Sequence, residues 1–243
     1  MIPLQRPPEV PPPLQRAALW RAASLGLWAL VLLCSSIDGR LDLLLRAVFH
    51  PLVALAGLLL LLVALLQLRL AFGPGRQERG DRRQARTLLL TTAIALLVLL
   101  LPPAPSFADL AGQRPRDETA ESELSFVLPP AQRSLTDWVR LLRSQPDPKL
   151  FAGDPVRISG FVLPMEGEPP QLARLLVRCC LADASPVGLP VAWPAGQAPF
   201  AADRWLAIDG VMGLKPAPGG GERLEVVPSR IRPIPRPARP LEP

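Results

Sequence analysis

Three long apolar runs fill most of the first hundred residues and constrain the fold more than any other feature. Residues 51–68, PLVALAGLLLLLVALLQL, carry no charge over eighteen positions, and residues 22–37 and 87–101 carry none over sixteen and fifteen. A helix that crosses a bilayer needs about 20 apolar residues, and about 17 are enough. Buried core helices of a soluble protein are the alternative, but runs of Leu, Val and Ala without a polar stripe do not fit it. We therefore expect three transmembrane helices, at about 17–37, 51–72 and 87–103.

The N-terminal end of the chain raises two further questions. Residues 1–16 contain six prolines, and we expect this segment to be disordered. The first apolar run could be a cleaved signal peptide, but its end reads LLCSSIDGR and lacks a small-x-small cleavage site. A lipid anchor on Cys34 would follow a small residue, whereas Leu33 precedes it. We expect the first run to be retained as a membrane helix.

The arginines predict the orientation in the membrane. The loop over residues 69–86 carries six Arg, whereas the segment 38–50 between the first two helices carries two Arg beside two Asp. Because short loops rich in Lys and Arg stay in the cytoplasm, the N-terminus and the second loop are expected there. Three crossings then place everything after residue 104 outside the cytoplasm, in a multi-pass protein of the plasma (inner) membrane. Residues 41–50 are expected along the outer interface or in a simple loop.

The charge distribution argues against a nucleic-acid-binding protein. Residues 1–103 carry eleven Arg against five acidic residues, a net charge of +6, whereas residues 104–243 carry sixteen basic and sixteen acidic residues. Binding of nucleic acid needs a basic face on a folded domain. The whole positive excess lies in the apolar half, so the bilayer is the expected partner of these arginines.

The second half has the pattern of a small β domain with one preceding helix. Residues 104–130 are expected to be a tether and residues 131–235 a domain, followed by a Pro-rich tail at 236–243. SLTDWVRLLRSQPDP, at 134–148, predicts a helix that Ser134 caps, with Asp137 in the first turn. Gly-punctuated short strands follow, which favours a five-stranded OB-like barrel, with another small barrel or sandwich as the alternative. The expected strands span residues 155–164, 172–182, 188–194, 203–213 and 222–234.

The order of motifs resembles a known family. A helix with a DW dipeptide precedes GDPVRISGFV, RCCLADASPVGLPV, RWLAIDGVMG and the Pro-rich IRPIPRP. With the N-terminal membrane helices, this order resembles the YcgQ-like family of bacterial membrane proteins, described as permease subunits, over about residues 17–235. The resemblance implies a polytopic membrane permease as partner in a two-component system. It implies neither a substrate nor a catalytic residue, and the Pro-rich N-terminus and Arg-rich second loop depart from it.

Two adjacent cysteines, Cys179 and Cys180, are the candidate site. In a regular strand their side chains would point to opposite faces, with Cys179 in the core and Cys180 outside beside Arg178, whose charge would favour a thiolate. Adjacent Cα atoms lie about 3.8 Å apart, so a disulfide between the two would be strained and easily reduced. Three interpretations stay open: two small buried hydrophobes, a redox switch, or a soft-metal contact completed by Asp183 and a partner's ligands.

Enzymatic chemistry finds little support in the sequence. The only histidine is His50, near the membrane, so the second half offers none as a general base. The Gly-rich APGGGE at 217–222 lacks the Lys-Ser/Thr end of a phosphate-binding loop, and we expect a hairpin there. Asp154, Asp203 and Asp209 are expected in turns at strand ends. The expected function is a non-enzymatic accessory subunit of a permease whose external barrel gates or presents substrate, and the alternative is a membrane-anchored thiol module.

Overall fold

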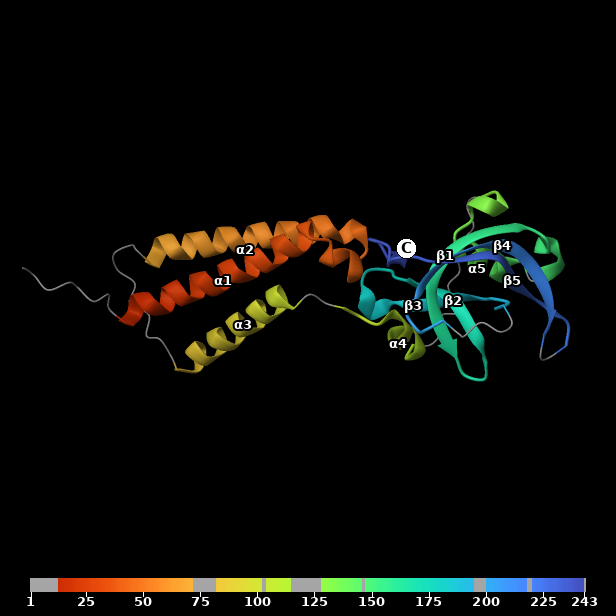
Figure 1. The fold of residues 1–243 in the computed structure, drawn as a ribbon. Coiled ribbons are helices and arrows are strands. Elements are labelled where there is room, and N and C mark those ends of the chain that lie inside the picture. The colour runs from red at the N-terminus through yellow and green to blue at the C-terminus, as the bar shows by residue number, and fades with distance from the viewer. Residues whose placement is uncertain are drawn as a thin grey trace, which may run out of the picture. The chain divides into compact units, whose positions relative to one another are not determined.

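The computed structural model describes two compact units joined by the chain (Figure 1). The first unit comprises residues 1–41 and 47–103, and the second comprises residues 42–46 and 104–243. Each unit is treated separately below. The described residues are 13–71, 82–101, 104–114, 128–145, 147–194, 200–217 and 220–242.

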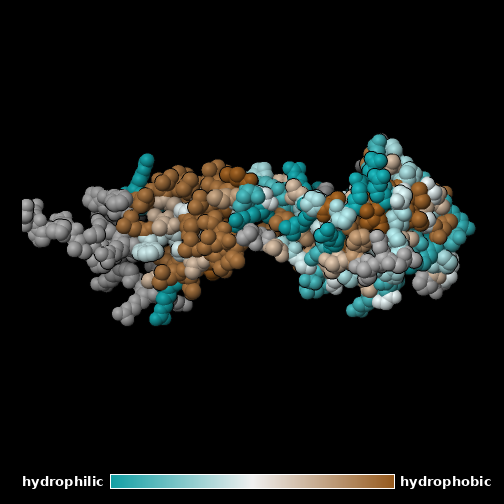
Figure 2. Space-filling view, viewed as in Figure 1, coloured by the Kyte–Doolittle hydropathy of each residue, from teal (hydrophilic) through white to brown (hydrophobic). Residues whose placement is uncertain are grey.

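The first unit is a set of three helices with small residues inside and leucines outside. Helix α1 (Pro13–Ile37) packs against both α2 (His50–Ala71) and α3 (Arg82–Leu100). Ala29 and Ala95 are completely buried, and a Cβ on Gly57 would lie 3.0 Å from the Leu33 side chain. The leucines of α2 and α3 are mostly exposed, and they give this unit its apolar surface (Figure 2). Close approach through small residues, with large apolar side chains facing outward, is typical of helices packed in lipid.

Two of the three helices are long and apolar enough to cross a membrane. These segments are Leu19–Ile37 and Ala47–Leu70, with mean hydropathies of 1.5 and 2.6. The third expected helix forms, but its apolar part, Ala85–Leu100, is shorter than the roughly 17 residues that a membrane-spanning helix needs. The 310 turns η1 (Arg40–Leu43) and η2 (Ala47–Phe49) separate α1 from α2, and the Arg40 guanidinium donates to the Val98 and Leu99 carbonyls at the end of α3. Disorder over residues 1–16 was expected: residues 1–12 lie outside the described residues, and Pro13 begins α1.

The second unit is built on one six-stranded sheet. Its main path runs in the order β3-β2-β1-β4-β5, with antiparallel neighbours throughout, and β6 pairs with β2 in parallel. Phe161 of β1 shows the register, because it lies opposite Ala173 on β2 and Trp205 on β4. The strands are β1 (Pro155–Met165), β2 (Glu168–Leu176), β3 (Ser185–Pro190), β4 (Trp205–Pro216), β5 (Glu222–Pro233) and β6 (Leu241–Glu242).

The expected OB-like barrel is not closed. Between the outer ends of the main path the described residues form one isolated bridge, which joins Val191, just after β3, to Val226 of β5, and the Ala192 N–H donates to the Val226 carbonyl at 2.9 Å. β3 is six residues long against twelve in β5, and its Pro186 and Pro190 have no N–H to donate. A continuous ladder between the two strands cannot form on that basis. The small β domain with one antiparallel main sheet is therefore confirmed, but full closure of the expected barrel is not.

A sixth strand enters where β1 and β2 separate. Their pairing ends at Phe161 and Ala173, and Leu175 of β2 pairs instead with Leu241 of β6. Gly160 lies at the separation point, where an added Cβ would come within 2.4 Å of the Ala173 carbonyl oxygen. The glycine thus allows β1 to pass close to β2 and then follow β4. The segment 236–243, expected as a tail, contains this strand.

Two apolar clusters hold the sheet and its helices together. The larger one packs α5 (Leu135–Ser144) on the sheet through Trp138, which is completely buried. Ser134 caps α5 as expected: its hydroxyl accepts from the Asp137 N–H, and the Asp137 carboxylate accepts from the Ser134 N–H. The short 310 turns η3 (Pro130–Gln132) and η4 (Pro148–Phe151) flank this helix.

The second cluster includes a helix that lies within the expected tether. Helix α4 (Phe107–Gly112) contributes Phe107, which is 1% exposed and packs with ring centroids 5.8 Å from Phe161 and 5.9 Å from Trp205. Asp203, with φ at 62°, accepts a hydrogen bond from the Ala108 N–H at 2.6 Å. Residues 107–112 are therefore part of the domain core, while residues 115–127 of the expected tether lie outside the described residues.

Candidate thiol and metal site

The cysteine pair lies in a turn and not in a strand. β2 ends at Leu176, residues 178 and 179 bend, and the 310 turn η5 (Leu181–Asp183) follows before β3. The expected strand over 172–182 was therefore too long at this end. Polar contacts explain why β2 ends at Leu176. The Asp183 carboxylate accepts hydrogen bonds from three consecutive backbone N–H groups that would bond to a neighbouring strand if β2 continued.

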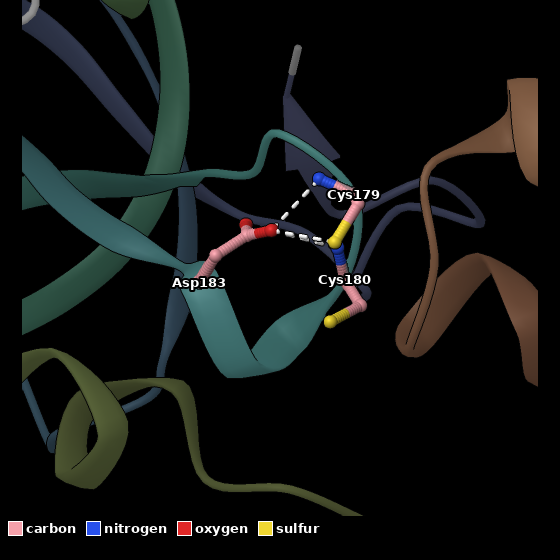
Figure 3. Close-up of side chains that lie close together, drawn as sticks. All are labelled: Cys179, Cys180 and Asp183. Atoms are coloured by element: carbon pink, nitrogen blue, oxygen red, sulfur yellow. Dashed lines mark hydrogen bonds between the residues drawn. The ribbon is translucent and has the colours of Figure 1, made fainter.

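Asp183 organises the turn through both of its carboxylate oxygens. Oδ1 accepts from the Arg178 N–H at 2.9 Å, and Oδ2 accepts from the N–H groups of Cys179 at 2.8 Å and Cys180 at 3.2 Å. The Cys179 thiol also donates to Oδ2, with 2.8 Å between sulfur and oxygen (Figure 3). This one carboxylate therefore fixes the backbone around both cysteines and contacts one of the sulfurs.

The structure brings together the three candidate site residues. One ligand atom from each of Cys179, Cys180 and Asp183 can be chosen so that all lie within 4.8 Å of one another. Cys179 is exposed, whereas Cys180 and Asp183 are half-buried. The expectation that Cys179 joins the apolar core is wrong, because it assumed a regular strand. All three cysteines of the chain, including Cys34 in α1, are free thiols.

The hydrogen bond between Cys179 and Asp183 shifts both pKa values in opposite directions. The contact with the Asp183 carboxylate, followed by that with Cys180, raises the pKa of the Cys179 thiol to about 12 from a usual 9.0. Burial acts to raise the pKa of Asp183, but the hydrogen bonds from the Cys179 thiol and the surrounding N–H groups outweigh it and lower that pKa to about 2. Near neutral pH, Asp183 is thus ionised and Cys179 carries its proton.

Backbone contacts from two distant segments support the turn. Residues 42–46, which belong to the second unit, run beside it: the Arg46 N–H donates to the Cys179 carbonyl at 3.0 Å, and the Leu181 N–H donates to the Leu44 carbonyl at 2.8 Å. Arg114, just after α4, donates through its guanidinium to the Ala182 and Ala184 carbonyls. Sequence reasoning missed both supports, because their partners lie about 70 to 135 residues apart along the chain and no local pattern joins them.

Other polar residues singled out from the sequence do not join the cluster. Asp209 lies inside β4 and not at a strand end, and it pairs with Arg157 and Arg232. The single histidine, His50, begins α2 in the first unit. β4 and β5 pair as a hairpin on either side of the Gly-rich segment, as expected, with Pro216 opposite Glu222, while residues 218 and 219 lie outside the described residues.

The fold and site define a protein with a helical unit, in which two segments are long and apolar enough to cross a membrane, and a β unit that carries a thiol–carboxylate cluster. Comparison with protein families matches residues 131–227 to the DUF1980 C-terminal domain. This range runs from just before α5 into β5 and includes Cys179, Cys180 and Asp183. Curated proteins and solved structures give no match to the chain.

Proposed function

We propose that the β unit is a soft-metal-binding thiol module held at a membrane by the helical unit. The observation that supports this proposal is the cluster itself, in which two sulfurs and one carboxylate oxygen lie within 4.8 Å of one another in a turn with an exposed cysteine. Thiolate ligands favour Cu(I) and Zn(II) over harder cations. Three ligands leave a coordination position for a ligand from a partner or from a transported species.

Asp183 has two roles in this proposal. Before metal binds, the Asp183 carboxylate accepts a hydrogen bond from the protonated Cys179 thiol. It also orders the turn by accepting hydrogen bonds from backbone N–H groups. When a metal binds, Cys179 loses that proton to solvent, and the carboxylate becomes available as an oxygen ligand. Binding through Cys179 and Cys180 therefore releases protons, and the affinity for metal rises with pH.

The test measures metal affinity of the full chain in detergent under reducing conditions. Cu(I) is titrated in competition with a chromogenic chelator, and Zn(II) is titrated separately. We expect one equivalent bound, and at least a hundredfold loss of affinity in the double variant Cys179→Ser, Cys180→Ser. Cys34→Ser is the matched control and should bind as the parent does. Equal affinity in the parent and the double variant, with unchanged circular dichroism, would refute the proposal.

An accessory role in a permease is the second candidate. It is supported by the presence in one chain of apolar helices long enough to cross a membrane and of a separate folded domain. The resemblance to membrane proteins described as permease subunits also supports it. In this candidate the helices dock on a polytopic permease, and the domain gates or presents its substrate. Co-purification in mild detergent with a permease encoded beside this chain tests it. Assembly should survive Cys179→Ser and Cys180→Ser, and repeated failure to co-purify when both proteins are well expressed would remove this candidate.

Both candidates take the protein as multi-pass in the inner membrane, with the N-terminus inside and the β unit outside. The six arginines of residues 69–86 support this orientation, since an Arg at a helix centre costs about 2.5–3.5 kcal/mol to insert. The test places a cysteine at Ser122 in a variant without the three native cysteines and adds a membrane-impermeant maleimide to spheroplasts. Labelling of intact cells supports an external domain. Labelling only after lysis would mean that the short third helix does not cross.

A further inference from the structure

A second polar site lies in the β unit, apart from the cysteine residues. It is a cavity of about 430 Å³ between the start of α5 and the strands β1, β2, β4 and β5, and Glu242 of β6 also contributes to its wall. We propose that this cavity binds a small phosphate-like oxyanion. Its charged lining residues are Arg133, Arg157, Arg174, Arg232, Asp209 and Glu242.

Two exposed arginines would contact the anion. Arg157 on β1 and Arg232 on β5 point to the same carboxylate from opposite sides of β4: Arg157 Nε lies 3.4 Å from Asp209 Oδ1, and Arg232 Nη2 lies 3.1 Å from Asp209 Oδ2. One carboxylate thus serves two guanidinium groups, whose side chains are 78% and 55% exposed. The arginines keep N–H donors for a second, external acceptor, and a guanidinium matches the paired oxygens of a phosphate.

Two buried arginines supply fixed positive charge to the cavity wall. Arg174 donates from Nε to the Ser159 carbonyl and from Nη2 to the Ser159 hydroxyl, both at 2.8 Å, and it pairs with Glu242 at 3.3 Å. Arg133 donates to the Leu128 carbonyl at 2.7 Å and pairs with Asp154 at 3.3 Å. Their hydrogen bonds hold both guanidinium groups in place, so no reorganisation is needed when an anion enters.

The balance of charge and the size of the cavity select the ligand class. Four arginines face two carboxylates in the lining, and Asp154, outside it, pairs with Arg133, which leaves one positive charge in excess. A volume of about 430 Å³ lies within the range of about 300–1,000 Å³ that is usual for small-molecule sites. A free phosphate group and the phosphate of a lipid headgroup share the required chemistry, and the experiment separates them.

The experiment titrates inorganic phosphate into the full chain in nanodiscs of zwitterionic lipid, at constant ionic strength, by isothermal calorimetry. We expect saturable binding that weakens at least tenfold in the double variant Arg157→Gln, Arg232→Gln. Arg204→Gln, which removes an exposed arginine outside the cavity, is the control and should leave the affinity unchanged. Nonsaturable binding, or equal affinity in the parent and the double variant, would overturn the proposal.

A second arm identifies the source of the phosphate group. Nanodiscs that contain phosphatidylglycerol replace the zwitterionic ones, and the apparent affinity for inorganic phosphate is measured again. A fall in affinity that the double variant does not show identifies the lipid headgroup as an occupant of the same cavity. An equal fall in both proteins reflects surface charge alone and leaves free phosphate as the ligand. The Cys179→Ser, Cys180→Ser variant should bind phosphate normally, which separates this proposal from the metal site.

Discussion

Replacing Asp183 by Asn should make Cys179 far more reactive. The carboxylate accepts a hydrogen bond from the thiol at 2.8 Å and is the largest of the causes, with Cys180 the next, that raise the pKa of Cys179 to about 12 from a usual 9.0. At pH 8 a pKa of about 12 gives a thiolate fraction of about one in ten thousand, against about one in ten for an unshifted thiol, so the loss of Asp183 can raise this fraction by about a thousandfold at most. An amide in place of the carboxylate removes the negative charge and can donate a hydrogen bond to the sulfur, so the thiolate becomes favoured.

The expected change in rate is smaller than the change in thiolate fraction. A thiolate of lower pKa is a weaker nucleophile, and a Brønsted slope of about 0.45 reduces the gain about twentyfold, which leaves about fortyfold. Because Cys179 is exposed, solvent and salt screen its contact with Asp183 and reduce the effect of the carboxylate. We therefore take about fivefold as the smallest increase in reaction rate that supports the contact.

The assay follows the reaction with an aromatic disulfide reagent by absorbance, in a chain that carries Cys34→Ala and Cys180→Ser. Asp183→Asn is compared with the same chain without it, from pH 7 to 10. The rate of the variant should level off at lower pH than that of the parent. Asp147→Asn is the matched control, because Asp147 also accepts a backbone N–H in a turn, from Lys149 at 3.0 Å. An increase in rate of less than about fivefold in Asp183→Asn, with the circular dichroism spectrum preserved, would refute the assigned contact.

Three further predictions concern stability, each measured by chemical denaturation of the full chain with tryptophan fluorescence. Phe107→Ala should lower the free energy of unfolding of the β unit by about 3–5 kcal/mol, since the ring is buried; a loss below 1 kcal/mol would mean that α4 is not part of the core. Gly160→Ala should cost about 3 kcal/mol or more, because the new Cβ would lie 2.4 Å from the Ala173 oxygen; a neutral effect would contradict the close approach of β1 to β2. Glu242→Ala should cost about 3 kcal/mol by leaving Arg174 buried without its charge partner, and Glu242→Gln should cost less; equal costs would show that charge is not the cause.

Local signals in the sequence predicted most elements of the β unit. The Ser134 and Asp137 spacing placed α5 correctly because a capping box depends on residues three apart. Short β-rich runs found the five longer strands, but both ends of β2 and of β3 lie three to six residues before their expected positions, and β4 is shifted by two to three residues toward the C-terminus. The end of β2 was misplaced because alternation continues through Val177 and Cys179, and only the carboxylate of Asp183 turns the chain there.

Contacts between distant residues explain what the sequence did not reveal. Phe107 sits in a segment of low hydrophobicity, and its burial depends on Phe161 and Trp205, more than fifty residues away. The proximity of Cys179, Cys180 and Asp183 could be expected from the sequence because they lie within five positions of one another. The arginine cavity was missed, because Arg157 and Arg232 converge on Asp209 only through the pairing of β4 with both β1 and β5.

The sixth strand covers an edge of β2 that could otherwise pair with another copy of the chain. Where β1 leaves β2, the backbone of Leu175 and Val177 would present unpaired groups, and an unpaired strand edge can recruit a strand from another copy. The chain covers this edge itself, with Leu241 opposite Leu175 and the Val177 N–H donating to the Glu242 carbonyl at 2.9 Å. A chain cleaved after residue 237 would keep the matched family domain and lose this cover. Such a chain should form dimers or larger aggregates through β2, at concentrations where the intact protein stays monomeric.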